Sequence, residues 1–147
     1  NDGVLSTNQD KAQVGVINYV PGYGVAVWTK PGAKLVPKVK LAHNTAWRVF
    51  GKTTFKGQTW YHLGGDQWVS AEHMILVGEQ RATKGVTRVL GNTTAQVFDG
   101  PGTTGQKRML PAGSAWIVGT IGAAQNQLWY KVGTGQWIQA GKTSGIR

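Results

Sequence analysis

The 147-residue chain carries 16 Lys and Arg against six Asp and Glu, a formal net charge of +10, with 22 Gly, seven Trp and no Cys. The missing cysteines exclude disulfides, thiol catalysis and Cys-ligated zinc, and no run of about 18 apolar residues offers a membrane-spanning helix. The charge is +5 over residues 10–78 and +6 over 79–147, which favours a polyanionic partner such as nucleic acid, anionic lipid or a phosphate-rich polymer. The alternative is that the charge only maintains solubility.

The N-terminal residues 1–13 are polar and aperiodic and are predicted to be a linker tail. No positively charged and apolar leader precedes them, so no secretory signal is expected within the sequence. A first strand is expected from Val14 to Val20, a turn over 21–24 and a second strand from Val25 onwards. Many Val, Thr and Trp beside the glycines, with no long helical period, predict an all-β chain.

A 14-residue stretch occurs twice: residues 58–71 return as 127–140 at an offset of 69. In each copy aromatic and aliphatic residues flank a glycine turn, which predicts a β-hairpin. Upstream segments also recur: Gly15-Val16 as Gly85-Val86 and 25–32 as 95–102 at an offset of 70, and 46–49 as 115–118 at 69. The change of offset falls between Gly32 and Leu41, which is expected to be a loop.

The repeat predicts two small units of about five short strands each. The expected boundaries are a first unit at 14–78, a linker at 79–84 and a second unit at 85–147. Units of this size bury a modest core, so large aromatic side chains are expected to supply much of the stability.

Two motifs in these units are similar to boxes of bacterial SH3 domains. The "NVRSGPG" box resembles Val97-Phe98-Asp99-Gly100-Pro101-Gly102, and the "WYKV…GWV" hairpin resembles Trp129-Tyr130-Lys131-Val132 followed by Gln136-Trp137-Ile138. The chain therefore resembles the SH3b and SLAP-type repeats of lactic-acid bacteria over about 14–77 and 84–141. Such repeats occur in peptidoglycan hydrolases such as endolysins, in lytic bacteriocins and in surface-layer proteins.

This resemblance implies two tandem small SH3-like barrels in a secreted, wall-associated, monomeric chain. Its implied ligand is a bacterial cell-wall polymer: peptidoglycan, wall teichoic acid or lipoteichoic acid. Two departures from the family pattern stand out. Trp28 and Phe98 stand where Arg is usual, and residues 139–147 lack the usual aromatic closing strand.

Catalytic and metal chemistry are not expected. The three histidines, His43, His62 and His73, lack metal-ligand spacing. The six carboxylates are scattered rather than paired for glycoside hydrolysis. We therefore expect no enzyme activity, no cofactor and no metal.

Aromatic residues support a binding role, because an indole offers apolar area and one N–H donor for stacking on sugar or peptide. Alternation puts Trp60 and His62 on one face of the hairpin strand and Tyr61 on the other, and one face must be core. Trp60 and Trp129 are candidate exposed ligand contacts, with a core role as the alternative. Trp47 and Trp116 are expected in the core, and Trp68 and Trp137 are expected to point outward.

In the resembled family the long first loop borders the peptide groove, which implicates Asn18, Tyr19 and Tyr23. The second copy lacks these aromatics and offers cations suited to phosphate, so we expect a division of labour. The ligand-binding candidates are Asn18, Tyr19, Tyr23, Trp28, Trp60, His62, Phe98, Trp129 and Lys131, and the polyanion-binding candidates are Lys38, Lys40, Arg88, Lys107 and Arg108.

Two other functions compete with wall binding. Basic, aromatic-rich small barrels also bind RNA and single strands. Against a nucleic-acid partner, the basic residues do not cluster into a run beyond residues 34–40. A protein-interaction module for proline-rich ligands is the third interpretation, and secretion argues against it.

Overall fold

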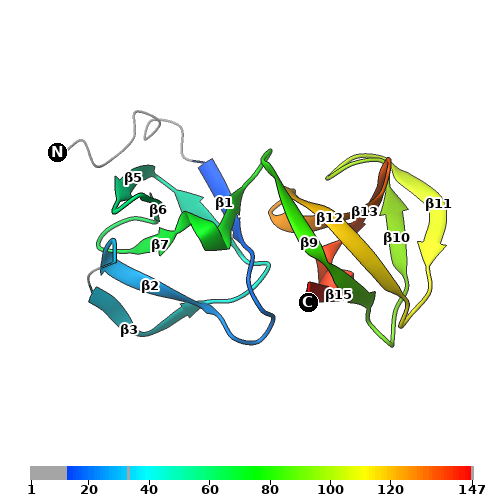
Figure 1. The fold of residues 1–147 in the computed structure, drawn as a ribbon, viewed down its shortest axis with the longest axis horizontal. Coiled ribbons are helices and arrows are strands. Elements are labelled where there is room, and N and C mark those ends of the chain that lie inside the picture. The colour runs from blue at the N-terminus through cyan, green and yellow to red at the C-terminus, as the bar shows by residue number, and fades with distance from the viewer. Residues whose placement is uncertain (1–12, 33, 147) are drawn as a thin grey trace. The chain divides into compact units, whose positions relative to one another are not determined.

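The computed structural model describes residues 13–32 and 34–146, and the chain divides into two compact units, Asn1–Leu76 and Val77–Arg147 (Figure 1). The strand pairs of the described part are antiparallel, and its helical elements are short 3-10 turns, which confirms the all-β prediction. No helix in these ranges is long and apolar enough to cross a membrane. The predicted tail lies outside the described residues except for Gln13, which begins the first strand.

The first unit contains two sheets, with strand orders β4-β1-β8 and β3-β2-β7-β6-β5. A 3-10 turn, η3 (Ala71–His73), joins the last two strands. The strands are β1 (Gln13–Ile17), β2 (Val25–Lys30), β3 (Lys34–Leu41), β4 (Ala46–Val49), β5 (Gly51–Phe55), β6 (Gln58–His62), β7 (Trp68–Ser70) and β8 (Met74–Leu76).

The second unit forms one sheet with the order β11-β10-β14-β13-β12-β9-β15. Its β12 is continuous where the first unit has the separate β4 and β5, and the register shifts between Val118 and Thr120. The elements are β9 (Gln80–Val89), β10 (Ala95–Phe98), β11 (Gly105–Leu110), β12 (Ala115–Ala124), β13 (Gln127–Gly133), β14 (Gln136–Gln139), η4 (Ala140–Lys142) and β15 (Thr143–Ile146).

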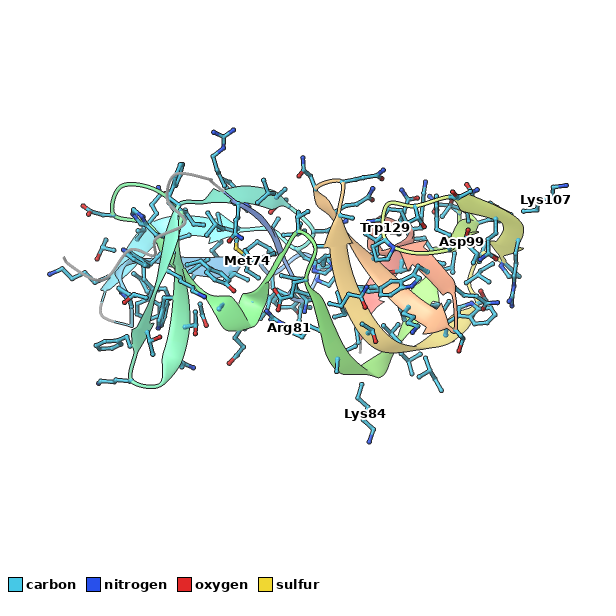
Figure 2. The ribbon with its side chains drawn as sticks, turned by 90° about the horizontal axis from the view of Figure 1, so that it is seen from above. Met74, Arg81, Lys84, Asp99, Lys107 and Trp129 are labelled. Atoms are coloured by element: carbon cyan, nitrogen blue, oxygen red, sulfur yellow. The ribbon has the colours of Figure 1, made fainter. Side chains whose placement is uncertain are left out.

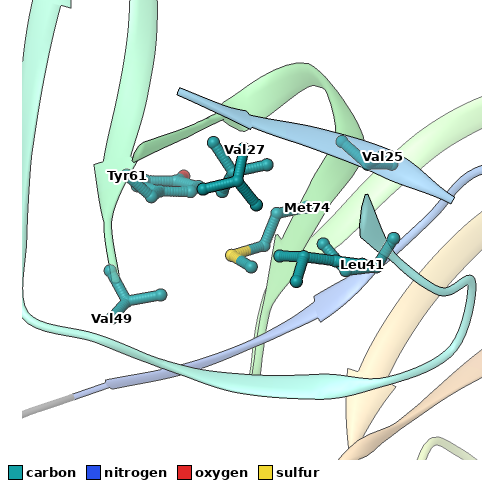
Figure 3. Packing of buried hydrophobic residues seen from close by; sticks show 8 residues of the cluster. Val25, Val27, Leu41, Val49, Tyr61 and Met74 are labelled. Carbon is teal, nitrogen blue, oxygen red and sulfur yellow. The ribbon is translucent and has the colours of Figure 1, made fainter. Parts of the chain in front are cut away.

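The core of the first unit collects the inward-facing residues of both sheets. Met74, fully buried on β8, lies among Val27 of β2 and Leu41 of β3 (Figure 3). The remaining members are Ile17, Val25, Val49, Tyr61 and Val69. The second unit buries Val97, Val118, Leu128, Tyr130 and Ile138 to 0 % exposure. Burying such side chains stabilises each unit by about 1.5–3 kcal/mol per residue.

Both copies of the predicted hairpin form in the same register. Tyr61 pairs with Val69 in the first unit, and Tyr130 pairs with Ile138 in the second. The first turn is possible because Gly64 and Gly65 adopt positive φ angles of 104° and 50°, a region that costs glycine nothing.

The prediction that one face of the hairpin strand is exposed is wrong. Trp60 is only 5 % exposed and Tyr61 8 %, and Trp129 and Tyr130 are 1 % and 0 % exposed. The second face is covered because an aromatic ring two strands away in the same sheet packs edge-on against each indole. The ring centroids of Trp28 and Trp60 are 5.8 Å apart, and those of Phe98 and Trp129 are 4.9 Å apart.

The other tryptophans also differ from expectation. Trp47, expected in the core, is 40 % exposed, and Trp116 is half-buried; both indole N–H groups donate to nearby hydroxyls. Trp68 and Trp137, expected to point outward, are 7 % and 4 % exposed. Trp68 stacks on the ring of His62 with centroids 4.6 Å apart, so a residue of the same unit shields this indole from solvent.

Several segments predicted as loop or linker are strands. Residues 34–41 form β3 because they pair with β2. Residues 80–84, expected as the linker between units, begin β9 and pair with residues 120–122 of β12. Residues 143–146, where the usual aromatic closing strand of the resembled family is missing, form β15 beside β9 without an aromatic residue. These strands form because their backbone groups hydrogen-bond to a neighbouring strand. They lack the apolar pattern from which a strand is predicted.

The first strand of the repeat, but not the segments after it, is shifted by two residues from the predicted alignment. Gly15 pairs with Trp47, whereas the residue that pairs with Trp116 is Thr87, not Gly85. The loop that follows is correspondingly shorter in the second unit, where it spans 90–94 instead of 18–24. Asn18 therefore corresponds to Leu90, and both backbone N–H groups donate to the equivalent carbonyl oxygens of His73 and Lys142.

Candidate functional site

A groove of about 380 Å³ lies on the first unit, between the loop 18–24 and the end of the hairpin. It brings together four of the predicted site residues: Tyr19, Trp28, Trp60 and Lys40. Its other lining residues are Gly24, Val25, Ala26, Gln58, Ser70, Glu72 and His73. The groove thus combines aromatic rings with one cation, one carboxylate and small residues.

The aromatic wall of the groove is formed by Trp28 on β2 and Trp60 on β6, packed edge to face. Trp28 is half-buried and Trp60 almost fully buried. The indole Nε1 of Trp60 has no hydrogen-bond partner among the described residues. By contrast, Nε1 of Trp129 donates to the Ala124 carbonyl oxygen at 3.0 Å. A buried donor without an acceptor is costly, and of these two equivalent indoles it is Trp60 that carries the cost.

The loop bearing Tyr19 is held in place by hydrogen bonds. The backbone N–H of Tyr19 donates to Nδ1 of His43 at 3.0 Å, and the backbone N–H of Asn18 donates to the His73 carbonyl oxygen at 2.9 Å. The Tyr19 ring meets the His73 ring edge-on, with centroids 5.0 Å apart. Tyr19 therefore stands at the groove in a fixed position while remaining 39 % exposed.

Burial lowers the pKa of His43 below its ordinary value of 6.5. This direction agrees with the hydrogen bond, because Nδ1 accepts only when it carries no proton. The contribution of this contact to stability is complete above pH 6.5 and is lost as the pH falls from there through the lowered pKa. We therefore expect protonation of His43 to remove the acceptor of the Tyr19 backbone N–H.

Two oppositely charged side chains, Lys40 and Glu72, line the groove from different elements of the first unit. Lys40 is exposed on β3, where it pairs with Ala26. Glu72 stands in η3 with a side chain that is 67 % exposed, and its backbone N–H is capped by Oγ of Ser70 at 3.3 Å. One carboxylate oxygen lies 3.6 Å from Nε2 of His73. The groove can therefore present a cation and a carboxylate to one ligand.

The second unit has the same backbone frame with different side chains. At the positions of Tyr19, Ala26, Lys40 and Glu72 it carries Gly91, Gln96, Met109 and Gly141, as the paired registers and the 69-residue offset show. The amide of Gln96 donates to the Gln106 carbonyl, and Gln139 reaches Gln127 at 3.4 Å. Aromatic, cation and carboxylate are thus replaced by neutral side chains and glycine.

Some predicted ligand residues lie outside the groove. Tyr23 is 71 % exposed at the tip of the same loop, and Asn18 is half-buried beside it. His62 is packed between Trp68 and Phe50, and its Nε2 lies 2.7 Å from the Gly65 carbonyl oxygen.

In the second unit, the prediction that Trp129 is an exposed contact is wrong, because this side chain is core. Phe98 is half-buried against it. Lys131 borders a separate shallow depression of about 320 Å³ together with Ile117 and Thr120.

Of the predicted polyanion residues, Lys40 lines the groove of the first unit, whereas Arg88, Lys107 and Arg108 belong to the second unit. Arg88 is exposed on β9 and donates to the Gly113 carbonyl at 2.6 Å. Arg108 lies 5.6 Å from the ring centroid of Trp116, and Lys107 points away from the strands (Figure 2). Lys38 stands in β3, with its side chain outside the described part of the structure.

Gln58, Ser70, Glu72 and His73 line the groove but are not among the binding residues predicted from the sequence. A signal existed for two of them. Glu72-His73 corresponds to Gly141-Lys142 at the 69-residue offset, and a charged pair that breaks an otherwise close repeat points to a unit-specific role. In the described residues no group of three or more His, Cys, Asp or Glu could hold a metal.

Comparisons with known proteins find one family model that matches part of the chain. The model of the Surface layer protein A domain matches residues 26–72. No curated protein matches the chain. Among solved structures, Endolysin LysPBC5 CBD is 17 % identical, with a TM-score of 0.36, over 92 % of this chain and 93 % of its own.

Two further structures are also distant. A putative autolysin from Listeria monocytogenes is 17 % identical with a TM-score of 0.33, covering 89 % of this chain and 61 % of the autolysin. NlpC2 from Trichomonas vaginalis is 15 % identical with a TM-score of 0.30, covering 90 % and 48 %. Residues 26–72 of the first unit thus match the Surface layer protein A domain, which confirms the predicted resemblance to SLAP-type repeats.

Proposed function

We propose that the chain is a non-catalytic module of a secreted, wall-associated protein and binds a bacterial cell-wall polymer through the groove of its first unit. The observation that carries this proposal is the overlap between groove and family match. Ala26, Trp28, Lys40, Trp60 and Glu72 all fall within residues 26–72. The aromatic lining supports it, since aromatic rings bind sugar and peptide faces at small entropic cost. The net charge of +10 supports attraction to wall phosphate.

The direct test is sedimentation of the full chain with purified sacculi, before and after removal of teichoic acid. We expect co-sedimentation with at least one of the two preparations and no release of sugar or peptide ends. Absence of binding to both preparations overturns the proposal. Release of wall fragments that persists after repurification overturns the non-catalytic assignment.

Closing the groove should weaken wall binding without unfolding the chain. Ala26→Gln introduces the residue that the second unit carries at the same place, Gln96. Because Ala26 is half-buried at the groove, the longer side chain occupies ligand space. We expect a loss of about fivefold in affinity, or about 1 kcal/mol. Gln96→Ala is the matched control and should bind like wild type; equal effects of both variants would contradict the groove assignment.

Charge should contribute in a salt-dependent way. Replacing Arg88, Lys107 and Arg108 by Gln removes three exposed cations of the second unit. We expect weaker sedimentation at about 0.05 M NaCl and little difference at about 0.5 M, because the Debye length falls well below 10 Å at the higher salt. A loss that is equal at both salt concentrations would assign these residues a specific contact instead.

A further inference from the structure

The charges at the groove point to the kind of polymer that it selects. Units with net charges of +4 (Asn1–Leu76) and +6 (Val77–Arg147) should attract any polyanion. The described residues include four carboxylate side chains, of which three lie elsewhere: Asp66 is in the hairpin turn, Glu79 pairs with Arg81 at 3.0 Å, and Asp99 accepts from Gln106. Glu72 is the one placed at the groove.

A carboxylate at this position opposes the binding of a bare polyphosphate. Glu72 is held in place, because η3 is capped by Ser70 and the His73 carbonyl accepts from the first loop. Its side chain is 67 % exposed and so is accessible to a ligand. Lys40 lines the same groove from β3. A ligand that carries only anions would satisfy Lys40 and be repelled by Glu72.

We propose, on the basis of the proposed function, that the groove selects a polyol-phosphate polymer whose hydroxyl groups carry amino-acyl esters. Lys40 binds a phosphodiester oxygen, and Glu72 binds the ammonium of the neighbouring ester. The aromatic wall of Trp28 and Trp60 and the ring of Tyr19 cover the apolar polyol and ester carbons. The second unit cannot make this selection, because Met109 and Gly141 replace the two charged residues.

The test compares lipoteichoic acid that carries its alanyl esters with the same polymer after mild alkaline removal of the esters. General charge attraction predicts tighter binding of the de-esterified polymer, because that polymer is more negative. The proposal predicts the opposite: wild type binds the esterified polymer about two- to fivefold more tightly, the range of an exposed ion pair. Titration calorimetry on the full chain measures the affinity for each of the two polymers.

Matched variants separate the groove from general charge. Glu72→Gln should abolish or reverse the preference for the esterified polymer, whereas Asp66→Asn, which changes the net charge equally outside the groove, should keep it. Lys40→Gln should weaken binding of both polymers more than Lys52→Gln, an exposed lysine on β5. Circular dichroism confirms that each variant is folded.

The outcomes distinguish this inference from the proposed function. Wild type that binds both polymers without preference, or Glu72→Gln that retains the preference, overturns the inference and leaves wall binding in place. If wild type binds sacculi equally well before and after removal of teichoic acid, the inference is also overturned and wall binding stays in place, because the ligand is then peptidoglycan. Absence of binding to sacculi and to both polymers overturns the proposed function, and the inference with it.

Discussion

Trp129→Ala should destabilise the second unit by about 3–5 kcal/mol, as expected for a large aromatic removed from a core. The indole is 1 % exposed, packs against Phe98 and donates its N–H to the Ala124 carbonyl. The substitution therefore leaves a cavity and an acceptor without its donor. A unit of about 70 residues has a total stability of only a few to about 10 kcal/mol, so a loss of this size leaves it marginal or unfolded.

The measurement is urea unfolding of the full chain followed by circular dichroism and tryptophan fluorescence. If the two units fold independently, as the repeat suggests, one transition moves to lower urea and the other stays in place. Trp116→Ala is the control, because it removes the same residue type from the same unit at a half-buried position. We expect it to cost about 1 kcal/mol. A Trp129→Ala midpoint no lower than that of Trp116→Ala would show that the indole is not core.

Tyr19→Ala should weaken wall binding about tenfold, close to 1.4 kcal/mol. The side chain borders the groove, is held by the backbone bond to His43, and is 39 % exposed, so its ring can contact a ligand without rearrangement. A pre-positioned ring with few rotatable bonds contributes binding energy at small entropic cost. Its loss should affect stability little, because the side chain is 39 % exposed and the bond to His43 comes from the backbone N–H, which the substitution keeps.

Tyr23→Ala is the matched control for this prediction. Tyr23 is on the same loop and is 71 % exposed, but it does not line the groove. We expect its affinity for sacculi to stay within about twofold of wild type, as for most surface substitutions. If both variants bind equally well, the loop does not contact the ligand. If Tyr23→Ala has the larger effect, the ligand binds at the loop tip and not in the groove.

The first prediction concerns folding and the second concerns binding. The sequence proposed all these aromatic residues as ligand contacts, whereas in the structure some are buried and others are exposed. Trp60 and Trp129 occupy equivalent hairpin positions and are both buried, so removing either one tests folding before it tests binding. Tyr19 and Lys40 are exposed at the groove and can be removed with less damage to the core. Binding experiments on this chain are therefore clearest at the loop and at β3.

The amino-acid sequence alone determined the all-β class and both hairpins, because glycine turns flanked by alternating aromatic and aliphatic residues specify that local structure. Its motifs also indicated a resemblance to surface-layer repeats, which the match over residues 26–72 confirmed within the first unit. The sequence could not show that both faces of β6 and β13 are covered. That outcome depends on Trp28 and Phe98, which lie two strands away in the same sheets, and such contacts between segments far apart in the chain exist only after folding.

The tertiary structure also decided the true repeat alignment and the membership of the groove. The first loop is two residues shorter in the second unit, and only strand pairing shows that Thr87 takes the place of Gly15. Glu72 and His73 stand out in the sequence only as a departure from the repeat, which does not place them at a groove. They belong to the groove because the His73 carbonyl binds the backbone of the first loop, more than 50 residues earlier in the chain. Local pattern determines strands and turns, whereas the side chains that share a site are determined by which distant backbone segments pair.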